Sequence, residues 1–168
     1  NKDDLAAIIV TPVGHNNAHP VEMPKPGFLE GLKELAHKNN AVLIFDEIRS
    51  GFRFSLGGAQ KVFGVTPDLG CFGKAMANGY DISMVCGKKE VMDVATPGDN
   101  VFISSTYFPN SLSMVASLKT IEILERDNVL NDIKKKGEMF AKKVRPFIEK
   151  KGFPVQFTGE PYMPYITF

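Results

Sequence analysis

The spacing of apolar residues predicts alternating strands and helices in the first part of the chain. Leu5–Val10 and Val42–Phe45 are short apolar runs rich in β-forming residues, which is typical of strands buried on both faces of a parallel sheet. Between them, apolar residues recur at helical spacing over Pro26–Lys38, and the pair Asn39-Asn40 ends that helix. A strand, a helix and a second strand in this order predict a parallel pair joined by a crossover helix.

Later segments continue this alternation and then give way to long helices. Short apolar runs bounded by turn residues predict further strands, and two long helical repeats start near Asn110 and Asp127. This order predicts an α/β domain with a mainly parallel sheet over residues 1–125, and the start of a small α+β domain over residues 126–168. The later strands are expected at Leu69–Phe72, Ser83–Cys86, Val101–Ser104, Val155–Phe157 and Tyr165–Phe168.

Composition and charge argue against nucleic-acid and membrane partners. The 168 residues are 43% hydrophobic and 23% charged, which is ordinary for a soluble globular protein. A formal net charge of +1 gives no electrostatic reason to expect either partner. No run reaches the roughly 18 apolar residues that span a bilayer. A group of lysines on the second long helix indicates a solvated helix face rather than an anion-binding patch: Lys134, Lys135, Lys136, Lys142 and Lys143.

The cysteines and histidines indicate a reducing compartment and no metal. Cys71 and Cys86 both lie in apolar runs, so we expect free thiols in the cytoplasm rather than a disulfide. His15 and His19 share one loop, with no cysteine or acidic residue at metal-ligand spacing, so we expect no metal site there.

Two charged motifs directly follow predicted strands. Asp46-Glu47 ends one strand and Gly73-Lys74 ends the next, and ligands of α/β sheets bind at the carboxyl ends of strands. The simplest alternative is that the acids cap a helix or face solvent, and that Lys74 is one exposed lysine among many. However, Lys74 precedes Ala75–Gly79, which carries no other charge. This setting predicts a partly desolvated amine that can act as a nucleophile or a base.

An acid and a lysine at strand ends fit two kinds of chemistry. A P-loop nucleotide hydrolase needs Gly-x-x-x-x-Gly-Lys-Ser/Thr, normally upstream of the acid. Gly70–Ala75 has the wrong spacing, lacks the hydroxyl and follows the acid. Pyridoxal phosphate (PLP) chemistry needs a lysine for a Schiff base and a carboxylate beside the pyridine nitrogen, and both residue types are present.

Five segments, in order along the chain, resemble the motifs of class III (ω-type) aminotransferases, with glutamate-1-semialdehyde aminomutase-like members closest. The resemblance covers about residues 5–150 and implies the α/β fold of a fold-type I, PLP-dependent transferase. The five segments are Leu43–Arg53, Leu56–Gln60, Val65–Leu69, Gly73–Gly79 and Ser104–Tyr107.

The resemblance implies a role for each matched site residue. Lys74 would form the Schiff base with PLP and carry the proton in the transfer step, and Asp46 would pair with the pyridine nitrogen. Ile48 would pack against one face of the ring. Thr106 would bind the cofactor phosphate from the neighbouring subunit of a homodimer with shared active sites. The alternative for Thr106 is a hydroxyl that caps the following helix.

Two further motif residues are expected to support the site without touching the reacting atoms, and two positions depart from the family pattern. Glu47 and Arg53 lie in the first motif, where we expect internal support rather than a chemical step. Thr11 stands where the family commonly has Glu, and Tyr80-Asp81 stands where a proline is common. The second departure affects the backbone next to the lysine motif and is expected to alter substrate choice.

The expected activity is amino-group transfer between a small-molecule amino donor and a carbonyl acceptor, or the internal exchange of an aminomutase. The rival hypothesis is a non-catalytic, aminotransferase-like binding or assembly module. Asp46, Lys74 and Thr106 argue against it, since a decayed site has no reason to keep them. The family's phosphate-binding glycine loop is not found in these residues. We therefore expect either a part of a longer enzyme or a remnant that needs a complementary chain, and in both cases we expect it to be inactive by itself.

Overall fold

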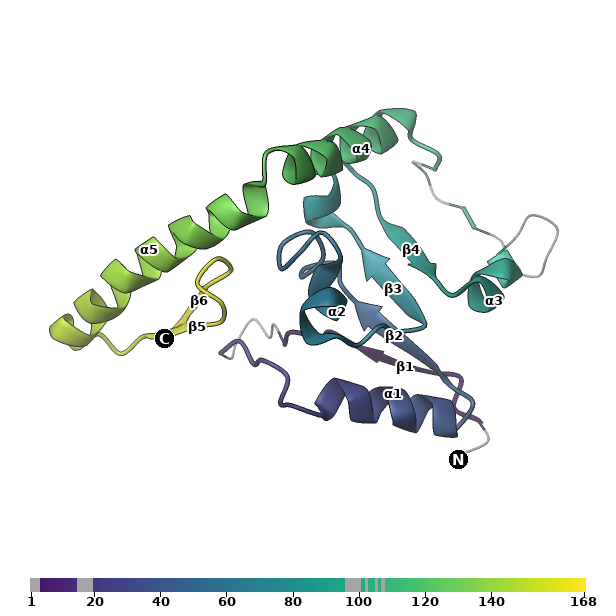
Figure 1. The fold of residues 1–168 in the computed structure, drawn as a ribbon, viewed down its shortest axis with the longest axis horizontal. Helices are drawn as coiled ribbons and strands as arrows, with labels where there is room; N and C mark the ends of the chain where they lie inside the picture. The colour runs from purple at the N-terminus through teal and green to yellow at the C-terminus, as the bar shows by residue number, and fades with distance from the viewer. Residues whose placement is uncertain (1–3, 15–19, 96–100, 102, 105, 107) are drawn as a thin grey trace.

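The computed structural model contains a four-stranded sheet in the order β1-β2-β3-β4 (Figure 1). The first three strands are parallel, and β4 is antiparallel to β3, so the prediction of a mainly parallel sheet is confirmed. The strands are β1 (Ala7–Val10), β2 (Val42–Asp46), β3 (Leu69–Phe72) and β4 (Met84–Gly87). The structure describes residues 4–14, 20–95, 101, 103, 104, 106 and 108–168.

Helices flank this sheet, and a small hairpin lies beside the last of them. The first helix, α1, connects β1 to β2 as the crossover predicted from the sequence. Two long helices, α4 and α5, extend along one side of the molecule, with the antiparallel pair β5-β6 next to α5 (Figure 1). The elements are α1 (Phe28–Lys38), α2 (Gly58–Phe63), a 3₁₀ turn (Lys74–Met76), α3 (Lys89–Met92), a second 3₁₀ turn (Asp93–Ala95), α4 (Ser111–Arg126), α5 (Val129–Lys151), β5 (Gln156–Thr158) and β6 (Tyr165–Thr167).

The core of the sheet lies between β2 and α1. Leu43 and Phe45 of β2 are fully buried and pack with Leu29 and Ala36 of α1. The alternate β2 residues are half-buried, so the predicted burial on both faces holds fully for one face only. Because successive side chains of a strand point to opposite faces, Asp46 emerges on the face away from α1.

Two predicted strands differ from the structure, and one predicted loop lies partly outside the described residues. The first predicted strand is not buried: β1 pairs with β2 alone among the described residues, and Ile9 is 64% exposed. The strand predicted at Val101–Ser104 is wrong, because residues 101, 103 and 104 form no strand. Its apolar residues favour an extended chain, but a strand also needs a neighbour for its backbone groups, and the described sheet ends at β4. His15 and His19 lie outside the described residues.

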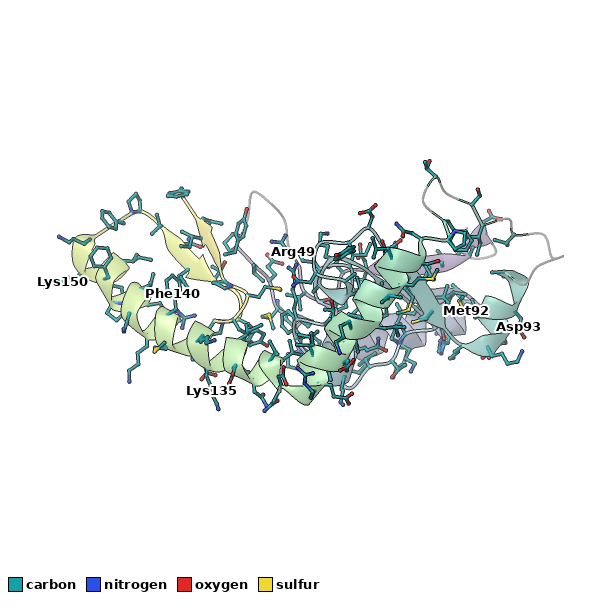
Figure 2. The ribbon with its side chains drawn as sticks, turned by 90° about the horizontal axis from the view of Figure 1, so that it is seen from above. Arg49, Met92, Asp93, Lys135, Phe140 and Lys150 are labelled. Atoms are coloured by element: carbon teal, nitrogen blue, oxygen red, sulfur yellow. The ribbon has the colours of Figure 1, made fainter. Side chains whose placement is uncertain are left out.

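The second long helix has the solvated face that its lysines predicted. Lys134, Lys135, Lys136, Lys142 and Lys143 are all exposed, and Figure 2 labels Lys135 on the outside of α5. In the part of the chain that the structure describes, no helix is long and apolar enough to cross a membrane.

The β5-β6 hairpin also contacts loops of the first part of the chain. The backbone N–H of Val21 donates to Thr158 Oγ1 at 3.0 Å, and Phe54 stacks edge-on against Tyr162 with ring centroids 5.5 Å apart. The division near residue 125 remains a prediction.

The buried carboxylate of Asp68, just before β3, links α1, β2 and the residue that follows β4. Asp68 accepts hydrogen bonds from the backbone N–H of Leu43 at 2.7 Å and from His37 Nε2 at 2.9 Å. Lys88 Nζ forms an ion pair with it at 2.7 Å. Burial by itself would raise the pKa of Asp68, but the hydrogen bonds from Lys88, Leu43 and His37 outweigh it and lower that pKa to about 2.

Acid should therefore weaken the fold through Asp68. Since its folded-state pKa lies below the ordinary value of 3.8, its contribution is fully present above about pH 4 and disappears as the pH falls towards 2. The free energy of unfolding should fall between pH 5 and pH 2 in the unaltered protein. In Asp68→Asn this fall should be smaller by about 1–2 kcal/mol. Urea unfolding across this pH range measures it, with Asp93→Asn as the exposed control. An unchanged acid dependence in Asp68→Asn would contradict the assignment.

Candidate active site

The carboxyl ends of β2 and β3 bring the predicted acid and lysine onto neighbouring strands. Asp46 is the last residue of β2 and lies opposite Cys71 of β3, three residues before Lys74. The Asp46 carboxylate accepts a hydrogen bond from the backbone N–H of Ile48 at 3.1 Å. Burial, and then the nearby Asp46 charge, raise the pKa of the Cys71 thiol. Asp46 is therefore a half-buried carboxylate at the ligand-binding edge of the sheet.

The second acid of the pair is a structural anchor. Glu47 is fully buried, and its carboxylate accepts hydrogen bonds from the backbone N–H groups of Ala59 and Gln60, both at 2.8 Å. The Ser50 hydroxyl donates to the same carboxylate at 2.6 Å. Both backbone groups belong to the first turn of α2, where helix N–H groups lack partners within the helix. The expectation of an internal support role for Glu47 is confirmed, and the alternative of a helix cap was partly right.

Gly58 makes room for this carboxylate. A Cβ at position 58 would lie 2.6 Å from Glu47 Oε1, and the backbone has φ of +72°, in the region that favours glycine. Glu47 directly follows β2 and its carboxylate contacts the start of α2, so this contact connects the two ends of the segment between β2 and α2. That segment carries Ile48, whose Cγ2 lies 3.7 Å from where a Cβ of Gly73 would be. Ile48 and the residue preceding Lys74 are therefore neighbours.

Lys74 lies on a strained 3₁₀ turn and is exposed. Its backbone has φ of +46°, which is uncommon for a residue with a side chain. The turn buries Met76 and Ala77 and leaves Lys74 exposed, so the predicted partial desolvation is not found among the described residues. Of the residues after Lys74, Met76 and Ala77 pack the turn against the protein, whereas Ala75, Asn78 and Gly79 line the same pocket as Lys74.

A pocket of about 660 Å³ opens beside Lys74. Its walls come from the segment after β2, the lysine turn, the adjoining ends of α4 and α5, and the loop before β6. Three of the five described non-glycine residues with positive φ line it, and such strain concentrates at functional sites. The lining residues are Phe52, Arg53, Lys74, Ala75, Asn78, Gly79, Thr120, Leu124, Val129, Leu130, Ile133, Tyr162 and Met163.

Thr106 is exposed and does not line the pocket around Lys74. The alternative that Thr106 caps the next helix is wrong for the described residues, because the Asn110 side chain caps α4. Asn110 Oδ1 accepts from the backbone N–H groups of Leu112 and Ser113 at 3.1 and 3.3 Å. The Thr106 hydroxyl is thus not used by α4.

These residues suit PLP in their chemistry and their placement. The site offers a primary amine on an exposed turn, a half-buried carboxylate on the neighbouring strand, and an aliphatic side chain next to the residue that precedes the amine. These are the covalent, ionic and apolar contacts that the cofactor requires. Lys74, Asp46 and Ile48 are the residues that would hold it.

Residues 1–160 match the family model described as "Aminotransferase class-III". The chain belongs to the class III aminotransferases. This membership excludes the nucleotide-hydrolase alternative and agrees with the resemblance that the motifs predicted.

Named relatives support the same family. The chain is 61% identical over 168 residues to a 3-aminobutyryl-CoA aminotransferase of Cloacimonas acidaminovorans, of which it covers 40%. It is 40% identical over 152 residues to a glutamate-1-semialdehyde 2,1-aminomutase of Brevibacillus brevis, covering 90% of this chain and 35% of that protein. This class III chain therefore spans between a third and two fifths of the length of these relatives.

Solved structures share the fold. The PLP-containing form of the FumI protein from Sphingopyxis sp. MTA144 has a TM-score of 0.90 and 26% identity, covering 98% of this chain and 39% of that one. An omega-transaminase from Sphaerobacter thermophilus has a TM-score of 0.81 and 32% identity, covering 99% and 38%. The prediction of a fold-type I, α/β PLP-dependent transferase is confirmed.

Two features of the class III site were not predicted from the sequence, namely the partners of Glu47 and the pocket. The partners of Glu47 had one usable signal, the glycine pair Gly57-Gly58 before a short helix, which leaves room for an acid. The pocket had none, because its wall residues Thr120, Leu130 and Tyr162 are separated from Lys74 by long stretches of chain.

Proposed function

We propose that this class III aminotransferase transfers amino groups between an amine-bearing substrate and a carbonyl compound with PLP held at Lys74. The observation that carries the proposal is the placement of Asp46 and Lys74 at the carboxyl ends of adjacent parallel strands, beside a pocket large enough for a small substrate. Family membership supports the same activity.

Each residue of the site has one task in this proposal. PLP, when bound, supplies a ring that accepts electrons from the substrate carbon. The Lys74 amine anchors the group covalently and, when free, takes up and returns a proton at Nζ. The Asp46 carboxylate would keep the pyridine nitrogen of the bound cofactor protonated, and Ile48 would exclude water from one side of the ring. The Glu47 anchor keeps the segment that carries Ile48 in position.

We favour aminotransfer between two molecules over internal exchange. The 61% identity to a 3-aminobutyryl-CoA aminotransferase, against 40% to an aminomutase, supports this choice. The amine-bearing substrate is then a 3-amino acyl thioester. The apolar wall formed by Leu124, Val129 and Ile133 suits its short carbon chain.

The intact protein is proposed to be a cytoplasmic homodimer with shared active sites, and Thr106 to bind the cofactor phosphate of the neighbouring subunit. The exposed Thr106 hydroxyl, which α4 does not use, supports this role. On α4, Leu112 is 65% exposed, Val115 63% and Leu118 72%, an apolar surface that suits contact with further protein.

A half-reaction experiment tests the function. The intact protein with PLP is mixed with 3-aminobutyryl-CoA alone, and then with glutamate-1-semialdehyde alone. We expect the thioester to convert the cofactor to its amine form and to give stoichiometric 3-oxo product, while the semialdehyde is not isomerised at a comparable rate. Isomerisation of the semialdehyde would instead indicate an aminomutase. Failure to bind PLP at millimolar concentration would favour the non-catalytic module.

A further inference from the structure

A second cavity, of about 420 Å³, lies at the start of α4, and its described walls share no residue with the Lys74 pocket. This volume is within the range of small-molecule sites. None of its side chains has a task in the proposed amino transfer. The walls come from the stretch before β4, the loop before α4 and the first turn of α4, and they are Asp81, Ile82, Ser83, Phe108, Asn110, Ser113 and Met114.

Ser113 is the buried polar side chain of this cavity. It is 2% exposed, and among the described residues nothing hydrogen-bonds its hydroxyl, since its contact with Asn110 uses the backbone N–H. Ser117 lies one turn further along the same face of α4, and its hydroxyl donates to the Met76 carbonyl at 3.2 Å. A buried hydroxyl without a partner is destabilising, so one that lines a cavity indicates a ligand that supplies the partner.

The charges around the cavity do not favour an anion. Asp81 is exposed and forms no ion pair with any described residue. Within the described chain, no lysine or arginine lines the cavity. Helix N–H groups often bind anions, but here the N–H groups of Leu112 and Ser113 already donate to Asn110 Oδ1. The cavity therefore favours a neutral or cationic ligand.

The Asn110 side chain distinguishes a hydroxyl-bearing ligand from an amine. Because its oxygen caps α4, its NH₂ group is the part left to meet a ligand, and that group only donates. An ammonium group cannot accept from it, whereas a hydroxyl accepts from the NH₂ and donates to a carboxylate at the same time. The two oxygens of Asp81 match two adjacent hydroxyls, and an acidic side chain binds ribose hydroxyls in dinucleotide-binding folds.

We propose that this cavity binds a ribonucleoside through the adjacent hydroxyls of its sugar. Asp81 accepts from the hydroxyls, the Asn110 NH₂ donates to one of them, and the Ser113 hydroxyl gains the partner that it lacks in the free protein. Phe108 is 58% exposed and offers its ring to stack with the flat base. The inference goes beyond the proposed function, because it assigns a second ligand to a cavity that does not contain Lys74.

The first test is calorimetric binding of adenosine to the intact protein, with and without PLP. We expect saturable binding in both cases, since the described walls of the two cavities are separate. Adenosine lacking its 2′ and 3′ hydroxyls should bind at least about 10-fold more weakly. Methyl riboside, which keeps the hydroxyls but has no base, should also be about 10-fold weaker. Equal binding of either analogue, competition by butylamine, or no binding of adenosine would overturn the proposal.

The second test locates the ligand with variants. Asp81→Asn should weaken adenosine binding about 10-fold, because the acceptor loses its charge. Ser113→Ala should weaken it about fivefold without lowering the urea midpoint, because the hydroxyl has no described partner to lose. Ser111→Ala removes an exposed hydroxyl outside the cavity and should change binding less than about twofold.

Lys74→Ala separates this cavity from the proposed active site. We expect it to bind adenosine as the unaltered protein does, whether or not the protein transfers amino groups. Loss of adenosine binding in Lys74→Ala would place the nucleoside in the Lys74 pocket and overturn the proposal. So would a Ser113→Ala variant that is less stable and binds adenosine normally, since the hydroxyl would then have a partner within the protein.

Discussion

Lys74→Ala should abolish amino transfer by the intact protein, with a loss of at least about 10³-fold in kcat. Two contributions disappear together, the covalent anchor of PLP and the proton carrier. The described pocket wall contains no other lysine that could take over. Borohydride reduction followed by peptide mass spectrometry should place the cofactor on Lys74 in the unaltered protein and on no lysine in the variant.

Two controls separate the chemistry of Lys74 from its charge. Lys74→Arg keeps a cation on the same strained backbone, but a guanidinium does not lose its proton, so it should be as inactive as the alanine variant. Lys135→Ala removes an exposed lysine of α5 and should leave activity within twofold. Added methylamine should restore part of the rate to Lys74→Ala. Cofactor fixed to a different lysine would contradict the assignment.

Glu47→Ala should lower the free energy of unfolding by about 3–5 kcal/mol, because two N–H donors and a hydroxyl lose a buried acceptor and a cavity remains. This is a large share of the 5–15 kcal/mol typical of a folded domain. Urea unfolding of the intact protein, followed by circular dichroism, measures the change.

Graded variants show whether the hydrogen bonds are responsible. Ser50→Ala removes one donor and should cost about 1–2 kcal/mol. Glu34→Ala, at an exposed position of α1, should change stability by less than about 0.5 kcal/mol. A loss in Glu47→Ala no larger than in the Glu34 control would show that the carboxylate does not anchor the segment.

Local patterns predicted the elements that depend on a few adjacent residues. The apolar run before Asp46 predicted a strand, which buries alternate side chains. The spacing over residues 26–38 predicted α1, because a helix buries every third to fourth side chain. The order of the motifs along the chain predicted that Asp46 and Lys74 hold the cofactor, which stays a proposal.

Features that depend on distant residues could not be predicted in the same way. The donors to Glu47 lie twelve and thirteen residues further along, and the far wall of the pocket includes Tyr162. The run at residues 101–104 contains strand-forming side chains, yet a strand forms only where a second chain segment offers its backbone. Exposure of Lys74 likewise depends on how its turn packs, not on the neutrality of its neighbours.

The order of the strands also bears on how the protein is made. Among the residues that the structure describes, each strand of the four-stranded sheet pairs only with strands that are adjacent to it in the sequence. The parallel pairs β1–β2 and β2–β3 are each closed by a crossover segment, which is slower than a hairpin but still more local than a contact with the far end of the chain. We therefore expect β1, α1 and β2 to assemble on the ribosome before the pocket wall in α5 has been synthesised. The strand ends would then be in place before the lysine pocket closes.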